Sequence, residues 1–257
     1  MKIFSVVSTK GGVGKTVTAV HLGGALAQLG YQTLLIDVDL QGGLTSYFRI
    51  DTSAVPTCSD VLSGAVGIEE AALQVRENLW VVPANSQMER TELELATASG
   101  GEVRLRRAFK RYLALQTIAP KVALIDCPSG WGAVTRNALL ASSAMIVPVN
   151  SEPAAVTNAN ATISAAWELS EYHDHTLKLL GVLLTRFRVT NAAKAIESQA
   201  CKLWPDTLFS TRIRQAERVN ELAITRETTS DVPANQAGPV GADYRALAAE
   251  VIQRGAL

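Results

Sequence analysis

The first segment whose residue types can do chemistry is STKGGVGKTVT, residues 8 to 18. Its glycines let the backbone curl closely around an anion with the N–H groups directed inward. Lys15 can reach a terminal phosphate, and the Thr16 hydroxyl can bind Mg²⁺. An apolar run precedes the segment and a helical pattern follows it, which is the context of a phosphate-binding loop. The predicted nucleotide contacts are Lys10, Gly11, Gly12, Val13, Gly14, Lys15, Thr16 and Val17.

This loop departs from the pattern G-x-x-x-x-G-K-[ST], because Thr9 stands at the first glycine and a second lysine, Lys10, follows it. KGGVGKT with a lysine in front resembles the deviant Walker A motif of the ParA/MinD group of P-loop ATPases. In that family the leading lysine reaches across a nucleotide-sandwich dimer to the phosphates in the partner subunit. The resemblance implies an ATP-dependent homodimer in which Lys10 serves the partner's ATP and Lys15 its own. Two ammonium groups are tolerable around a triphosphate and help to spread its charge during transfer.

The second apolar run ends in two carboxylates, in TLLIDVDLQGG. The family pattern here is D-x-D-P-Q-G, and Leu40 replaces the proline. An aspartate at the carboxyl end of a strand beside a phosphate loop can orient or polarise an attacking water. By resemblance Asp39 is that residue, so the predicted catalytic residues are Lys10, Lys15 and Asp39. Asp37 is expected to support the metal site through water.

A third acidic strand end lies in VALIDCPSG, residues 122 to 130. Four apolar residues followed by Asp126 form a Walker B pattern, whose carboxylate holds Mg²⁺ through a water. The family usually reads D-C-P-P-S, and this chain has one proline fewer. Cys127 is interpreted as a small buried residue rather than a nucleophile. The predicted cofactors are thus ATP and Mg²⁺, with Thr16, Asp37 and Asp126 at the metal.

Apolar runs and helical patterns alternate along the chain and predict an α/β fold. Strands are expected at 2–8, 32–37, 79–83, 121–126, 145–149 and 177–185, and helices at 15–29, 102–115, 153–172, 192–203 and 243–254. Because the apolar runs lack a polar face, the strands must be covered on both sides, as in a mainly parallel, doubly wound sheet flanked by helices. One P-loop NTPase domain over 1–257 is expected, with 226–241 as a surface loop.

Composition limits the classes of function. The 257 residues are 47% hydrophobic and 19% charged, which allows a sizeable core, and the formal net charge is zero. Three distant cysteines argue against a disulfide framework or a cysteine-only metal site. Neither a signal-peptide pattern nor a run of 18 apolar residues is present, so a soluble cytoplasmic protein is expected.

The resemblance extends to the C-terminus. TRIRQAERVNELA, residues 211 to 223, aligns with the family's T-x-I-P-R-N-x-R-x-S-E-A-P. Arg218 there takes the place of a basic residue that helps ParA-type members to bind DNA without sequence preference. Residues 178–226 hold nine basic and four acidic residues, a balance of +5. The predicted DNA contacts are Arg186, Arg188, Arg214 and Arg218. For the basic helix VRLRRAFKRYL, residues 103 to 113, a solvated face is the favoured interpretation.

These features favour a ParA-like partition ATPase that coats nucleoid DNA and releases it when a ParB-like partner stimulates slow hydrolysis. A MinD-like or other cargo-positioning ATPase is one alternative. A MinD-like ATPase that binds membranes is disfavoured, because such proteins end in a basic amphipathic helix with bulky apolar residues. The last segment here, YRALAAEVIQRGAL, is alanine-rich and carries two arginines. A metabolic P-loop ATPase is the other alternative, although no substrate-side catalytic residues stand out.

Overall fold

The computed structural model describes residues 1–115, 120–152 and 154–257. Its strands are β1 (Lys2–Val6), β2 (Thr33–Asp37), β3 (Leu73–Arg76), β4 (Leu79–Val82), β5 (Val122–Asp126), β6 (Ala144–Val149), β7 (Lys178–Phe187) and β8 (Leu208–Arg214). They form one sheet in the order β3-β4-β2-β5-β1-β6-β7-β8. Neighbouring strands run parallel except β3 and β4, which are antiparallel. The predicted mainly parallel sheet is confirmed.

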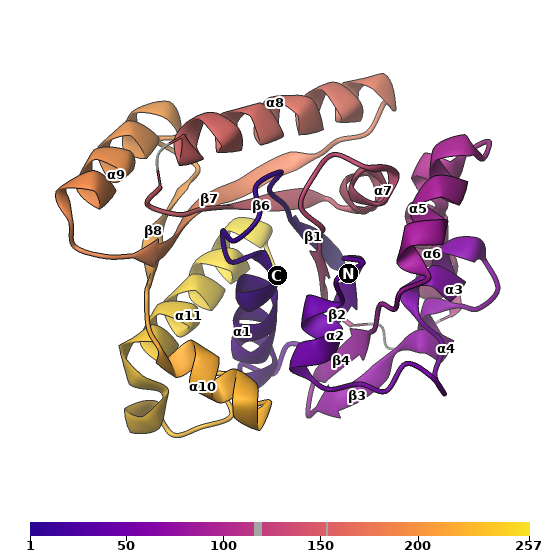
Figure 1. The fold of residues 1–257 in the computed structure, drawn as a ribbon, viewed down its shortest axis with the longest axis horizontal. Helices are drawn as coiled ribbons and strands as arrows, with labels where there is room; N and C mark the ends of the chain where they lie inside the picture. Colours follow the sequence, from indigo (N-terminus) through magenta and orange to yellow (C-terminus); the bar gives the residue numbers. More distant parts are fainter. Residues whose placement is uncertain (116–119, 153) are drawn as a thin grey trace.

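Helices cover both faces of this sheet (Figure 1). They are α1 (Lys15–Gln28), α2 (Gly43–Tyr47), α3 (Cys58–Ser63), α4 (Ile68–Ala71), α5 (Met88–Thr97), the short 3₁₀ helix η1 (Gly101–Val103), α6 (Arg104–Leu115), α7 (Ala133–Ala141), α8 (Ala155–Tyr172), α9 (Asn191–Leu203), α10 (Arg218–Thr225) and α11 (Ala234–Gly255). Helices α3 to α8 pack into one core, whereas α1, α2, α10 and α11 pack into the other. Within the described residues every helix is too short or too polar to span a bilayer.

The unbroken apolar runs of the strands follow from these two cores. In β2, Leu34 and Ile36 belong to the core beneath α3 to α8, and Leu35 between them belongs to the core beneath α1 and α11. Alternate side chains of a strand point to opposite faces, so both sets must be apolar when both faces are covered. The carboxyl ends of β1, β2 and β5 meet at one edge of the sheet, where the motifs predicted to bind nucleotide lie.

One predicted loop is partly wrong. Residues 226–241 were expected to form a surface loop, yet α11 begins at Ala234 and is kinked at Gly238. The preceding turn is also packed, because Thr228 and Thr229 are fully buried. The backbone N–H of Thr229 donates to Nδ1 of His21 at 3.1 Å, which ties this segment to α1. The predicted helix at 153–172 begins at Ala155 in the structure, and residue 153 lies outside the described residues.

Candidate nucleotide-binding site

The loop between β1 and α1 is shaped by its glycines and supported by β7. Gly12 and Gly14 have positive φ angles of 73° and 87°, a backbone region that a side chain would strain. The hydroxyl of Thr185 donates to the carbonyl oxygen of Val13 at 2.7 Å, and Nη1 of Arg186 donates to that of Gly12 at 3.0 Å. The N–H groups that begin α1 are therefore fixed around a space where an anion can bind.

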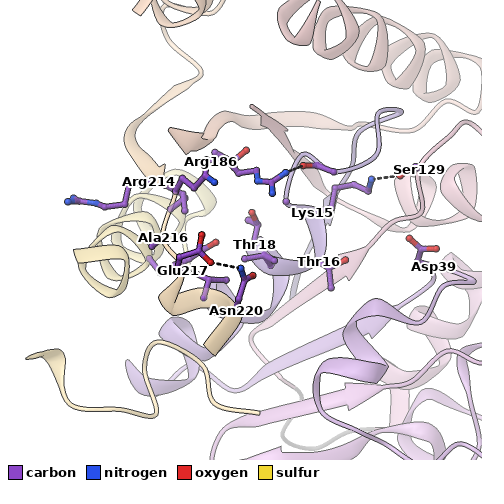
Figure 2. Close-up of a pocket in the computed structure, with 18 residues that line it drawn as sticks. Lys15, Thr16, Thr18, Asp39, Ser129, Arg186, Arg214, Ala216, Glu217 and Asn220 are labelled. Atoms are coloured by element: carbon purple, nitrogen blue, oxygen red, sulfur yellow. Dashed lines mark hydrogen bonds between the residues drawn. The ribbon is translucent and has the colours of Figure 1, made fainter. Parts of the chain in front are cut away.

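A pocket of about 370 Å³ opens beside this loop (Figure 2). One wall is the loop and the start of α1, and the opposite wall is the segment that joins β8 to α10. The lining residues outside the loop and α1 are Asp39, Ser129, Thr185, Arg186, Ile213, Arg214, Gln215, Ala216, Glu217, Val219, Asn220 and Tyr244. The loop end of the pocket is cationic and suits the phosphates of a nucleotide. The opposite end carries apolar and amide side chains, which suit its base.

Lys15 lines this pocket and is held in place. Its side chain is buried, and Nζ donates to Oγ of Ser129 at 2.9 Å and to the carbonyl oxygen of Lys10 at 3.2 Å. Burial lowers the pKa of the Lys15 ammonium, and the negative charge of Asp126 opposes that shift. A cation fixed in a poorly hydrated site interacts strongly with an incoming anion.

Lys10 has a different environment from Lys15. Among the described residues Lys15 lines the pocket, whereas Lys10 does not. The Lys10 ammonium instead forms an ion pair with the carboxylate of Glu152, and the two side chains are 27% and 54% exposed. An ion pair with this exposure contributes little to stability, because solvent screens it and the side chains lose freedom. Lys10 can therefore leave Glu152 at little cost when a stronger anion is offered.

Two of the predicted acidic residues are neighbours across the sheet. Asp37 at the end of β2 and Asp126 at the end of β5 are paired in register. Oδ2 of Asp37 accepts hydrogen bonds from the backbone N–H and the hydroxyl of Thr45, at 2.8 and 2.7 Å, and Oδ1 accepts the N–H of Asp39 at 3.1 Å. Burial nevertheless raises the pKa of Asp37 to about 6. Asp37 thus fixes the turn that follows β2, and it remains a predicted metal residue.

Asp126 is the carboxylate that most needs a cation. It is fully buried, and neither carboxylate oxygen has a hydrogen-bond partner of good geometry among the described residues. Burial, followed by the charge of Asp37, raises the pKa of Asp126 well above its ordinary value, and the nearby Thr16 hydroxyl partly offsets this rise. Buried charges in proteins are paired or bind metals. Asp126 together with the Thr16 hydroxyl fits the oxygen-rich environment that Mg²⁺ prefers.

Asp39 is placed for a different task. It is half-buried, lines the pocket with Thr16 and Ser129, and accepts the backbone N–H of Gln41 on Oδ1 at 3.0 Å. Because Asp39 lines an open pocket, water can reach its carboxylate. A partly hydrated carboxylate at the edge of a phosphate site can act on an attacking water.

Asp126→Asn is expected to stabilise the nucleotide-free protein. The folded-state pKa of Asp126 is raised, so its carboxyl favours folding below the ordinary pKa of about 3.8, and this contribution is lost as pH rises through the folded pKa. At pH 8 the variant should gain about 1–3 kcal/mol in the free energy of unfolding, and at pH 5 the gain should be smaller. Urea unfolding at both pH values measures this, with the half-buried Asp39→Asn as control. A variant less stable than the wild type at pH 8 would contradict the assignment.

The four predicted DNA-contacting arginines lie in two settings. Arg186 and Arg188 border one surface depression together with Glu152. Arg214 forms two hydrogen bonds with the carboxylate of Asp243, at 2.8 and 2.7 Å. Figure 2 shows its side chain directed away from Lys15. Arg218 donates to the carbonyl oxygen of Gln236 at 2.7 Å and pairs with Glu221 at 2.9 Å. DNA contact by these four residues remains a prediction.

Several residues of the site were not predicted from the sequence. Ser129 lies in the quoted DCPSG segment, but a lone serine carries no signal that it would meet Lys15. Glu152 is 142 residues from Lys10. In the wall opposite the loop, Gln215 and Asn220 stand where the family pattern has arginine and serine, and Tyr244 comes from α11. These contacts are set by the order of the strands rather than by local spacing.

Comparison with known proteins agrees with this geometry. Residues 1–179 match a family model described as an AAA domain. The chain is 34% identical over 223 residues to the sporulation initiation inhibitor protein Soj of Bacillus subtilis, which covers 86% of this chain and 87% of Soj. It is 31% identical over 225 residues to the chromosome partitioning protein ParA of Caulobacter vibrioides, which covers 86% of this chain and 83% of that protein. This chain belongs to the ParA/Soj family of P-loop ATPases.

A solved structure extends the comparison to ligands. Cobyrinic acid a,c-diamide synthase of Mycobacterium smegmatis, in a structure with bound ADP and magnesium, has a TM-score of 0.83 and 25% identity. The alignment covers 100% of this chain and 96% of the synthase. Both the P-loop ATPase fold and the resemblance to ParA/Soj ATPases predicted from KGGVGKT are thereby confirmed.

Proposed function

We propose that this ParA/Soj-family ATPase is a DNA-partition switch. ATP drives the formation of a sandwich dimer, the dimer binds DNA without sequence preference, and a ParB-like protein stimulates slow hydrolysis and release. The observation that carries this proposal is the position of Lys10. Its ammonium is next to the nucleotide loop yet outside the pocket of its own chain, where it is held by a weak, exposed ion pair.

Within one protomer the loop and Lys15 bind the ATP phosphates. The N–H groups around Gly12 and Gly14 surround the phosphate oxygens, and Lys15 is already directed inward by Ser129. Thr16 and Asp126 hold Mg²⁺, with Asp37 supporting the site through Thr45 and the turn after β2. Bound Mg²⁺ neutralises phosphate charge that develops during phosphoryl transfer.

Hydrolysis in this proposal needs groups from two protomers. Asp39 orients and polarises the attacking water from the pocket edge of its own chain. Lys10 leaves Glu152 and reaches the phosphates bound by the partner subunit, where its positive charge stabilises the transition state. Turnover by this dimer is slow until the ParB-like partner completes the site, so hydrolysis acts as a timer.

DNA co-sedimentation tests this function. The wild-type protein is incubated with DNA of unrelated sequence and ATP, ADP or no nucleotide, at low and moderate salt. We expect binding to be strongest with ATP and to weaken as salt rises, because phosphate contacts release counterions. A protein that binds DNA in this way is expected to be associated with the nucleoid in the cytoplasm. ATP-dependent binding to liposomes in place of DNA, or binding to neither, would overturn the proposal in favour of a MinD-like or a metabolic ATPase, respectively.

A further inference from the structure

The outer face of α6 carries four exposed cations. Its apolar side chains Leu105, Phe109 and Tyr112 are buried against the core. The opposite side presents a set of exposed basic residues, which are Arg106, Arg107, Lys110 and Arg111. Arg106 and Lys110, Arg107 and Arg111, and Arg107 and Lys110 are four, four and three positions apart, so successive members of the set are neighbours on the helix surface. This set is here called the α6 basic face.

The α6 basic face lacks paired carboxylates in the part of the chain that the structure describes. Among the described residues none of its four cations forms an ion pair. Arg106 and Lys110, like Arg107 and Arg111, are like charges at i,i+4 spacing, which destabilises a helix. The arrangement therefore lowers the stability of the helix, which favours a role in binding an anion.

The surface around these cations is hollowed. Arg106, Arg107 and Lys110 border one depression of about 290 Å³ together with Val103. Arg106 also borders a second depression, whose other lining residues include Ser143 and His175. This second depression lies at the amino-terminal edge of the sheet, opposite the nucleotide loop, because β6 begins directly after Ser143. The two depressions share Arg106, and the second is also lined by Asp174.

The C-terminal arginines offer less available charge than the α6 basic face. Arg214 is paired with Asp243, Arg218 with Glu221, and Arg212 with Glu197. A cation that is already paired must give up its partner before it can neutralise a phosphate. Helix α6 also covers the opposite face of the sheet from α10 and α11, so the two arginine groups are separate surfaces (Figure 1).

We propose that the α6 basic face is a contact for the phosphate backbone of double-stranded DNA, an inference that rests on the proposed partition function. Three of its four cations are arginines, whose planar guanidinium groups bind phosphate through two parallel hydrogen bonds. Insertion into a membrane is disfavoured, because Leu105, Phe109 and Tyr112 are buried in the core and the exposed apolar residues of α6, Leu113 and Leu115, lie in its last turn. Each protomer contributes one face, so an ATP-driven dimer doubles the contact and binds DNA more tightly than a monomer.

A charge-neutral variant tests this contact. Arg106, Arg107, Lys110 and Arg111 are all replaced by Gln in the full chain, and a matched control replaces four exposed cations outside both basic regions, Lys2, Arg49, Arg90 and Lys121, by Gln. Binding to a short DNA duplex is measured with ATP over a series of salt concentrations. The α6 variant should bind at least about tenfold more weakly at moderate salt, with a salt slope smaller by about two to four. DNA-free ATP turnover should be unchanged.

The outcomes separate this inference from the proposed function. If the control binds DNA like the wild type and the α6 variant does not, the α6 basic face is supported as a DNA contact. Equal DNA binding by the α6 variant and the control overturns the inference and leaves the proposed function standing. A wild type that binds no DNA in any nucleotide state overturns the proposed function itself. Loss of binding to phosphatidylserine vesicles by the α6 variant, with DNA binding intact, would assign the face to a membrane and contradict the inference.

Discussion

Replacing Lys10 with Ala is expected to abolish ATP-dependent dimer formation while monomeric nucleotide binding persists. The pocket of the chain's own nucleotide is lined by Lys15 and not by Lys10, so binding within one protomer retains its main cation. The variant loses the contact between Lys10 and the partner's phosphates, and with it the stabilisation that this contact gives to the dimer. Sedimentation velocity with ATP and Mg²⁺ measures the dimer, and titration with a fluorescent ATP analogue measures binding.

The matched variant is Lys15→Ala, which removes the buried ammonium from the pocket itself. It should weaken nucleotide binding severely and prevent dimer formation for that reason. Severe loss of nucleotide binding in both variants would contradict the separate roles of the two lysines. So would a Lys10→Ala protein that dimerises like the wild type.

Asp39→Ala is expected to trap the ATP-bound dimer. The carboxylate that acts on the attacking water is removed, whereas Lys10, Lys15 and the loop are left intact. Loss of a general base or water-positioning group reduces turnover by about 10²–10⁴-fold. Phosphate release measures turnover, and sedimentation velocity should show that the dimer persists after wild-type dimers have dissociated.

Asp39→Asn provides the conservative control for that variant. Its side-chain oxygen can still accept the N–H of Gln41, so the turn after β2 is retained while the negative charge is lost. It should be as slow as Asp39→Ala. Turnover equal to that of the wild type in either variant would move the water-activating role to another residue.

The acidic part of the site could be predicted from sequence because it depends on local rules. Asp37 and Asp126 each end an apolar run, and the carboxyl ends of parallel strands meet at one edge of the sheet. Their direct pairing across β2 and β5 follows from the strand order, which motif spacing does not specify. Because of this pairing Asp126 is buried, and its carboxylate lacks a hydrogen-bond partner of good geometry among the residues that the structure describes, which can be known from the structure alone.

Other features depend on contacts between distant segments. Glu152 meets Lys10 because β6 lies beside β1, and no local pattern marks a glutamate after a buried strand as a lysine partner. The polar segment 226–241 has the composition of a loop, but Thr229 packs against His21 and α11 begins early. Here tertiary burial outweighs local propensity.

The central claim, that Lys10 acts in the partner's site, is tested most directly by mixing two inactive variants. Lys10→Ala and Asp39→Ala proteins are combined before ATP is added. A mixed dimer has one complete site, in which the Lys10→Ala protomer supplies Asp39 and receives Lys10 from its partner. Lys10→Ala protomers are not expected to pair with each other, so they can enter dimers by pairing with Asp39→Ala protomers, and turnover should rise clearly above the sum of the two separate variants. Turnover no higher than the sum of the two separate variants, with mixed dimers detected, would show that Lys10 acts within its own chain.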